Sequence, residues 1–125
     1  MQKIILTTFV LLITFSNNTK AKWVDYLKKA NGSIYYYDNE RIKKKANFIK
    51  VWSRIRFKGS VMGAFSYQSL IRIDCTKFTE TTLQNTFFTD KNWKSPAMAT
   101  NMVKTSEIKI NKSSHAHILI NKLCK

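Results

Sequence analysis

The clearest pattern in this sequence is an alternation of apolar and polar side chains that begins at residue 48. Lys50, Arg54 and Arg56 share one side of an extended chain, and the opposite side carries Ile49, Val51, Ser53, Ile55 and Phe57. Period two of this kind is typical of an antiparallel strand with one buried face. Trp52 falls on the basic side, so we expect it to be exposed or covered by some other element.

Further strands follow from shorter patterns of the same kind. Residues 65–75 alternate from Phe65 to Cys75, and residues 77–88 are rich in Thr and Phe, although their two faces are less distinct. Residues 23–27 and 34–37 predict two short strands joined by a turn at Asn31-Gly32.

The remaining connections are polar or aperiodic. Residues 38–46 are expected to carry a turn. Residues 90–106 contain the sole proline and predict a long loop, with a helical turn within 97–103. A short extended piece is expected at residues 107–110.

A C-terminal helix is predicted to run to about Leu123. Ser113 or Ser114 can cap its start, and the apolar stripe consists of Ala116, Leu119, Ile120 and Leu123. The fold class is therefore α+β, a single antiparallel β-sheet of about five or six strands with one C-terminal helix.

The first 21 of the 125 residues predict a secretory signal peptide. A positive start at Lys3 precedes residues 4–15, which carry no charge, and Ala21 suits signal-peptidase cleavage. The apolar run is short for a membrane span, which needs about 20 residues. The domain expected to remain, residues 22–125, is long enough for one core.

Two cysteines, Cys75 and Cys124, fall within this domain. Export to an oxidising compartment favours one intrachain disulfide between them. The alternatives are a pair of metal ligands, for which further ligands are not evident, and a cysteine nucleophile, for which no base is evident. The bridge is expected to fasten the end of the helix to the strand that ends at Cys75.

The chain is strongly basic, with 22 Lys and Arg against 7 Asp and Glu and a net charge of +15. Such a charge attracts polyanions, among them sulfated glycans, lipid head groups, nucleic acid and acidic proteins. The alternative is that the lysines only solvate the surface. Charge alone identifies no partner, although export argues against nucleic acid.

The candidate ligand-binding residues form a basic hairpin and one strand face: Lys43, Lys44, Lys45, Lys50, Trp52, Arg54, Arg56 and Lys58. Together they would engage a sulfated glycan or an acidic protein segment. An equally good interpretation is a charged, solvated hairpin that resists strand-to-strand aggregation.

Other chemistry receives little support from the sequence. Tyr36 faces opposite to Tyr35 and Tyr37, so the tyrosines form no continuous stacking platform, and we expect them to pack in the core or under the helix. His115 and His117, two apart on a helix, point away from each other and predict no metal site. Phosphate-loop and nucleophile motifs are missing, so we expect neither an enzyme nor a cofactor.

The order of several segments resembles the bacterial surface-adhesin protein E family. The resemblance rests on Tyr36-Tyr37-Asp38 with Ile42 soon after, Val51-Trp52, the segment "SLIRIDC" at residues 69–75, the Thr/Phe-rich strand and the helix closing on Cys124. Members often have Gly in the turn where this chain reads Lys45-Ala46-Asn47. A lipid-attachment cysteine is also missing here.

The resemblance implies an antiparallel sheet with a helix held to its concave face by a disulfide, often in a homodimer. It implies a non-enzymatic surface adhesin that engages host extracellular matrix or other anionic ligands. The alternative is a periplasmic structural or accessory protein that binds another envelope component. Either function places the mature chain in the periplasm, at the cell surface or outside the cell.

Overall fold

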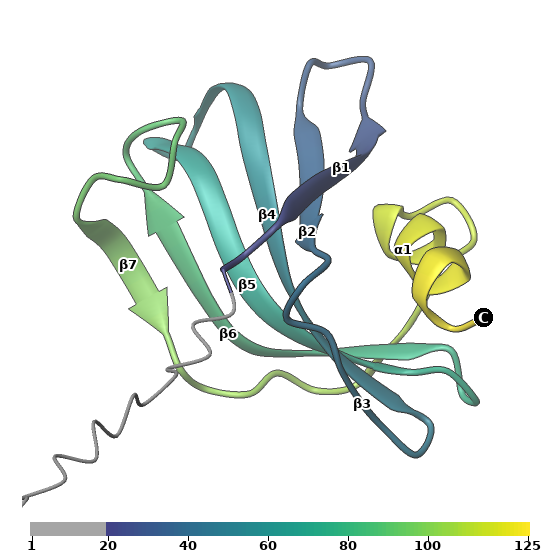
Figure 1. Cartoon of the computed structure of the whole chain (residues 1–125). Coiled ribbons are helices and arrows are strands. Elements are labelled where there is room, and N and C mark those ends of the chain that lie inside the picture. The colour runs from purple at the N-terminus through teal and green to yellow at the C-terminus, as the bar shows by residue number, and fades with distance from the viewer. Residues whose placement is uncertain (1–19) are drawn as a thin grey trace, which may run out of the picture.

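A computed structural model describes residues 20–125 of the chain, and the predicted signal peptide lies almost entirely outside the described residues. The described part is one antiparallel sheet and one helix (Figure 1). The elements are β1 (Trp23–Lys28), β2 (Ile34–Asp38), β3 (Lys43–Lys45), β4 (Phe48–Val61), β5 (Ala64–Asp74), β6 (Thr79–Phe88), β7 (Ala97–Asn101), β8 (Ile108–Lys109) and α1 (His115–Leu123). The α+β class is confirmed, and the sheet has 8 strands where five or six were expected.

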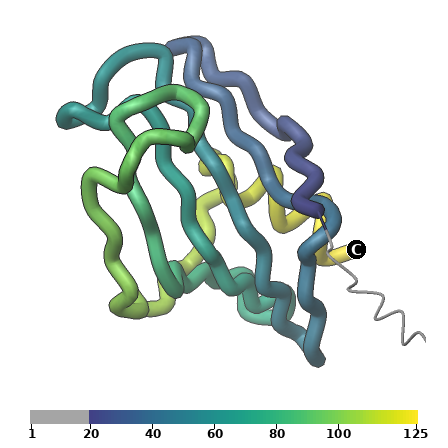
Figure 2. The backbone as a smooth tube through the Cα atoms, turned by 60° about the vertical axis from the view of Figure 1, so that its left-hand side comes forward, coloured from purple at the N-terminus to yellow at the C-terminus, as the bar shows by residue number. Residues whose placement is uncertain are grey.

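The long strand β4 organises the sheet, whose order is β1-β2-β4-β5-β6-β7. One edge of β4 pairs with two partners in turn, β3 along residues 48–50 and β2 along residues 53–56. The far edge of β6 is likewise shared by β7 and β8. Figure 2 shows how strongly the resulting sheet curls, with α1 on its inner, concave side.

The hydrophobic core lies between α1 and this concave face. Buried side chains from β4 and β5 meet the apolar stripe of the helix: Ile49, Val51, Ile71, Ile73, Leu119, Ile120 and Leu123. Burial of each of these side chains stabilises the folded state by about 1.5–3 kcal/mol. The alternation read from the sequence therefore placed the buried face of β4 correctly.

Both ends of α1 are fixed. Ser114 is the N-cap, and its hydroxyl accepts a hydrogen bond from the backbone N–H of His117. At the other end Cys124 forms a disulfide with Cys75, with Cα atoms 5.6 Å apart. This bridge closes a loop of 49 residues and stabilises the fold by roughly 4 kcal/mol in the chain-entropy model.

The helical turn expected within residues 97–103 is wrong, because residues 97–101 form β7. This segment pairs with residues 85–88 of β6, a non-local partner that its own sequence does not reveal. Ladder hydrogen bonds to β6 satisfy the backbone there, so no helical turn forms.

The turn between β3 and β4 holds one residue in a conformation that favours glycine. Ala46 has a φ of 52°, in the left-handed region. Glycine adopts this region at little cost. Ala46 adopts the same region in the segment Lys45-Ala46-Asn47, where the family that the chain resembles often has glycine. The turn therefore forms without glycine, at some cost in backbone strain.

Candidate binding surface

The outer face of the sheet, opposite α1, carries the basic side of β4. Register places Lys50 between Lys43 of β3 and Arg72 of β5, each as its direct Cα partner. Three cations therefore form a row across three adjacent strands. Like charges directly opposite on a sheet repel each other, so this row carries an electrostatic cost.

Two adjoining hollows surround the row. The larger has a volume of about 580 Å³ and is lined by Glu40, Arg41, Ile42, Lys43, Lys50, Trp52 and Leu70. The smaller, of about 380 Å³, is lined by Lys43, Lys45, Phe48, Lys50 and Arg72. We call this surface the basic groove, and its apolar floor consists of Phe48, Trp52 and Leu70.

The row of cations forms no ion pair among residues 20–125, although Glu40 lines the larger hollow and Asp74 lies near enough to Arg72 to interact electrostatically. Within residues 20–125 the one ion pair joins Arg41 to the buried Asp38. Burial alone would raise the pKa of Asp38, but hydrogen bonds from Arg41 and from the backbone N–H groups of Lys22 and Glu40 lower it below the usual range. Arg41 is thus paired at the rim, whereas in the described part of the chain Lys43, Lys50 and Arg72 have no carboxylate at ion-pair distance.

Farther along the same face of β4, two arginines are packed between aromatic rings. The Arg54 guanidinium lies 4.0 Å from the ring centroid of Trp23 and 4.6 Å from that of Trp93. The Arg56 guanidinium lies 5.1 Å from Trp93 and 5.5 Å from Tyr36. We call these five residues the arginine stack.

Hydrogen bonds hold the same two guanidinium groups. Arg54 Nε donates to Gln68 Oε1 at 2.7 Å, and Arg56 donates to the Tyr36 hydroxyl at 3.0 Å and to the carbonyl of Lys91 at 3.0 Å. Burial, and then repulsion from Arg41, lower the pKa of Arg54 to about 10, so it stays charged at neutral pH. These N–H groups of Arg54 and Arg56 are therefore bonded to the protein and are not free to bind an external ligand.

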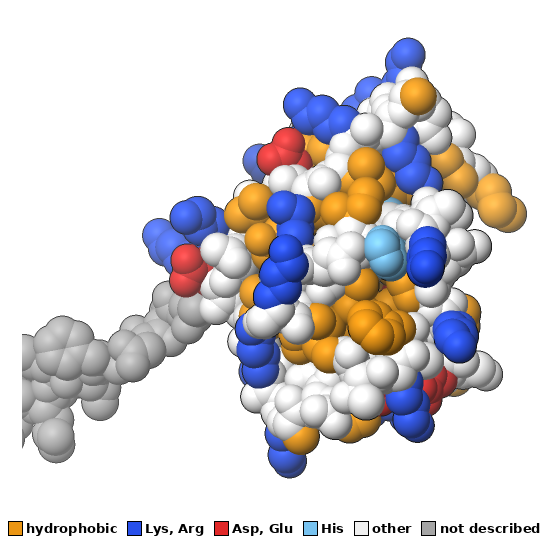
Figure 3. All heavy atoms as spheres, turned by 90° about the vertical axis from the view of Figure 1, so that its right-hand side faces the viewer, with side chains coloured by type: hydrophobic (Ala, Val, Ile, Leu, Met, Phe, Trp, Pro, Cys, Tyr) orange, Lys and Arg blue, Asp and Glu red, His pale blue; other side chains and the backbone are white. Residues whose placement is uncertain are grey.

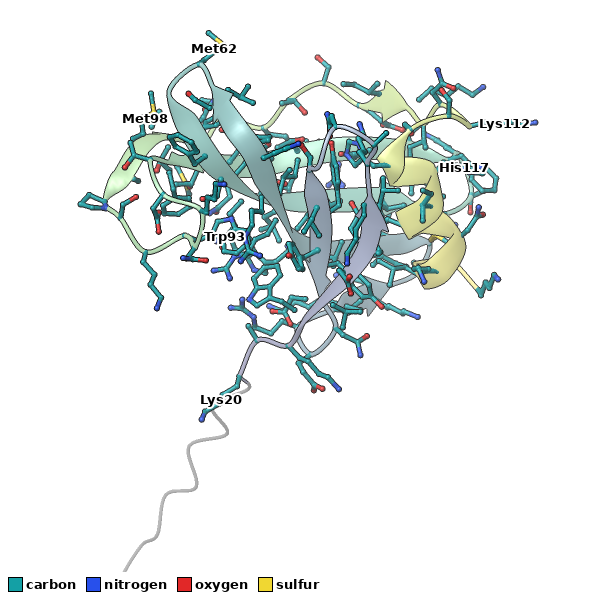
Figure 4. The ribbon with its side chains drawn as sticks, turned by 90° about the horizontal axis from the view of Figure 1, so that it is seen from above. Lys20, Met62, Trp93, Met98, Lys112 and His117 are labelled. Atoms are coloured by element: carbon teal, nitrogen blue, oxygen red, sulfur yellow. A yellow bond between two sulfur atoms is a disulfide. The ribbon has the colours of Figure 1, made fainter. Side chains whose placement is uncertain are left out.

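Trp93 reaches the stack from the loop that follows β6 (Figure 4). Its indole N–H donates to the Tyr67 carbonyl at 3.0 Å. Asp90 organises the loop by accepting hydrogen bonds from the backbone of Asn92, Lys94 and Ser95 and from the Ser95 hydroxyl. The Ser95 bonds in particular lower the pKa of Asp90 to about 2.

The predicted ligand-binding residues therefore lie at four places. Lys43, Lys45, Lys50 and Trp52 lie in the basic groove, while Arg54 and Arg56 belong to the arginine stack. Lys44 lines a hollow on the helix side beside Leu123 and Cys124. Lys58 packs against the turn at Gly32, away from the groove.

Sequence reasoning missed Arg72 of the groove and both Trp23 and Trp93 of the stack. Arg72 lies one strand away from Lys50, so strand register alone brings the two together. No local pattern pointed to the tryptophans. Their contacts with Arg54 join residues 31 and 39 positions apart in the chain.

Charge is also spread over other faces of the molecule. On the side that lies to the right in Figure 1, Lys and Arg side chains stand at several separate places and few acidic groups are visible (Figure 3). Net charge by itself therefore singles out no site. What distinguishes the groove is the direct opposition of its cations over an apolar floor.

The histidines and tyrosines have structural surroundings. The ring of His115 lies 4.7 Å from that of Tyr35, and Asn121 contacts His117 Nδ1 at 3.4 Å. Tyr35 is buried under the helix side, whereas Tyr36 packs edge-on against Trp93. Among residues 20–125 no three His, Cys, Asp or Glu side chains gather as metal ligands would.

Between residues 20 and 125 the structure has no helix with the length and apolar character needed to cross a membrane.

Comparison with known proteins gives consistent results. The family model for surface-adhesin protein E matches residues 23–125. A crystal form of Haemophilus influenzae protein E has a similar fold, with a TM-score of 0.66 at 13% identity over 85% of this chain and 91% of that chain. Protein E from non-typeable Haemophilus influenzae gives a TM-score of 0.63 at 13% identity, over 86% and 78% of the two chains. No curated protein sequence matches.

Proposed function

Because the chain belongs to the surface-adhesin protein E family, we propose that it is an exported, non-enzymatic adhesin-like protein that binds host extracellular matrix or another anionic ligand through the basic groove. The observation that carries this proposal is the row of Lys43, Lys50 and Arg72 across three strands, with no carboxylate among residues 20–125 at ion-pair distance. An incoming anion relieves the repulsion within this row.

The groove has the chemistry to hold a sulfated glycan or an acidic protein segment. Sulfate or carboxylate groups accept charge-assisted hydrogen bonds from the ammonium and guanidinium groups. Phe48, Trp52 and Leu70 offer apolar contact for sugar rings or side chains between the anionic groups. Added salt should weaken such binding, because it screens exposed charges.

Two features support export of the mature chain. The Cys75–Cys124 disulfide suits an oxidising compartment. The signal peptide predicted over residues 1–21 would deliver the chain there. A location at the cell surface would give the groove access to host ligands.

Protease shaving of intact native cells tests this proposal, with a known periplasmic protein as the leakage control. The groove hairpin carries exposed Lys43, Lys44 and Lys45, so trypsin should release peptides from this region before the outer membrane is opened. Complete protection until the membrane is opened would contradict surface adhesion. That outcome would favour the periplasmic accessory role, with an envelope protein as the partner.

A further inference from the structure

The concave side of the sheet contains a second set of polar groups that the basic groove does not involve. Two adjoining cavities, of about 200 and 240 Å³, lie between this face and the start of α1. They share Glu80, Thr82, His115 and Ala116 as lining residues. The inner one is more enclosed, and the outer one leads past exposed Ile108 toward solvent.

Glu80 is the central group of these cavities. Its register partner is Ile73, a core residue, so the carboxyl projects into the space between sheet and helix. Burial raises the pKa of Glu80, and no other influence on it is evident. Within residues 20–125 no cation forms an ion pair with it.

His115, which lines both cavities, does not supply the missing charge. Burial, and then repulsion from Lys29, lower the pKa of His115, so its imidazole is neutral at pH 7. When ionised, Glu80 therefore lies in a partly desolvated site where, among residues 20–125, no cation forms an ion pair with it. Such a group costs stability unless something pairs with it.

The inner cavity also contains an orphan hydroxyl. The Tyr26 oxygen is fully buried, and among residues 20–125 no group meets it with hydrogen-bond geometry. Burial raises the pKa of Tyr26, and the nearby Ser53 hydroxyl offsets this only in part. Buried polar groups are nearly always paired in native proteins, and this hydroxyl, with only the nearby Ser53 hydroxyl to interact with, can accept or donate a further hydrogen bond.

Two buried serines add to the polar lining. Ser53 and Ser69 are direct partners across β4 and β5 and face the same cavity. Neighbouring positions on this face of the two strands carry Val51, Ile55 and Ile71, so apolar side chains fit the surroundings. The two hydroxyls make the centre of the cavity polar, so a ligand that carries a hydrogen-bonding group fits there better than a purely apolar one.

We propose that this cavity binds a small molecule with a protonated amine, whose ammonium group pairs with Glu80 and hydrogen-bonds to the Tyr26 hydroxyl. The rings of Tyr26 and Tyr67 line the same space and favour a cation by cation–π attraction. The inner volume is below the range of about 300–1,000 Å³ that drug-sized ligands occupy, so the ligand is small.

The outer cavity determines what the other end of the ligand can carry. It is lined by Lys109 and by Ser114 at the N-terminus of α1, which tolerate a carboxylate. An amine and an amino acid of the same length both satisfy the site. A simple carboxylic acid does not, because with its carboxylate at Lys109 its apolar end would leave Glu80 unpaired, and the reverse orientation would bring two negative charges together.

Four probes of nearly equal size separate these cases: n-butylamine, 4-aminobutyrate, butyrate and n-butanol. Titration of the labelled protein, followed through ¹H–¹⁵N NMR shifts of Ser53, Ser69 and Thr82, should detect butylamine or 4-aminobutyrate and neither of the other two. Butyrate or butanol binding as well as butylamine would overturn the proposal. So would a failure of both amine probes to bind.

Matched variants then test the role of Glu80. Glu80→Gln should weaken binding of the amine by about tenfold or more, since a charge-assisted contact is lost. Glu107→Gln removes the same charge from an exposed residue that is bonded to Thr79, and should leave binding unchanged. Equal affinity in wild type and Glu80→Gln would contradict the proposal.

Tyr26→Phe provides a second, independent variant. It removes the orphan hydroxyl without disturbing the ring contacts with Tyr35 and Tyr37, so the fold should persist. Binding of the amine should weaken severalfold. An unchanged affinity would show that the hydroxyl does not meet the ligand and would contradict the geometry proposed.

Discussion

The two ends of the outer face of β4 carry the same kind of charge but use it differently. Arg54 and Arg56 at one end are packed between aromatic rings and hydrogen-bonded to the protein. Lys50 at the other end lies between two further cations in a hollow. Both ends belong to one strand and one face.

The difference shows that a basic side chain becomes available for binding only where the surrounding chain leaves it unpaired. At the arginine stack, β1 and the loop after β6 supply the indoles that cover the guanidinium groups. At the basic groove, β3 and β5 supply more positive charge, and a single ring, Phe48, lies 5.3 Å from the Arg72 guanidinium. The first arrangement stabilises the fold, and the second is suited to an external anion.

The largest expected effect comes from removing the indole shared by both arginines. Trp93→Ala should lower the free energy of unfolding by about 2–4 kcal/mol, because it deletes a large packed ring and two cation–π contacts. Urea unfolding measures this change. Trp52→Ala in the groove is the matched control and should cost clearly less, since no cation of residues 20–125 packs on the Trp52 ring.

Equal losses of unfolding free energy for the two tryptophan variants would contradict the difference between the arginine stack and the basic groove. So would a Trp93→Ala variant that weakened anion binding more than Trp52→Ala did.

A smaller effect is expected from the arginine alone. Arg54→Met keeps most of the aliphatic chain but removes the guanidinium from between two indoles, which should cost about 1–2 kcal/mol. Lys50→Met, the control on the same face, should stay within about 0.5 kcal/mol of wild type. Thermal unfolding of the three proteins side by side checks both values, and a costly Lys50→Met would show that the groove is structural.

The smallest effect concerns the loop that presents Trp93. The pKa of Asp90 is lowered to about 2 in the fold, below its ordinary value of about 3.9. Its contribution to stability is therefore full above about pH 4 and is lost as the pH falls toward 2. The difference in Tm between wild type and Asp90→Asn should be constant from pH 5 to 7 and should shrink below pH 4.

A difference in Tm that did not change with pH would mean that the Asp90 carboxylate is not what holds the loop. The other aspartates with lowered pKa, Asp38 and Asp74, are present in both proteins and so do not affect this difference.

The sequence allowed the core to be predicted because its signals are local. Alternation along β4 separated Ile49 and Val51 from Lys50 and Arg54, and the helical stripe with its serine cap predicted α1. Cys75 and Cys124 pair as expected. Each of these features depends on the period of a single element or on residue type.

Sites formed by several elements were harder to predict. The two faces of β6 looked indistinct because a register shift places Ile71 opposite Thr82 while Leu70 lies opposite Gln84. The extra residue, Leu83, changes the phase of the alternation. The inward position of Glu80 was therefore not apparent, and the roles of Trp93 and Arg72 depend on pairings that no single segment encodes.

The most direct test of the account compares two double variants in binding to one sulfated heparin oligosaccharide at fixed ionic strength. Lys43→Gln with Lys50→Gln removes two charges from the groove, and Lys44→Gln with Lys58→Gln removes two charges elsewhere. The groove variant should bind about tenfold or more weakly than wild type, while the control stays close to wild type. Equal weakening of both variants would mean that overall charge alone drives binding, which would contradict the claim that the unpaired cations of the groove form the site.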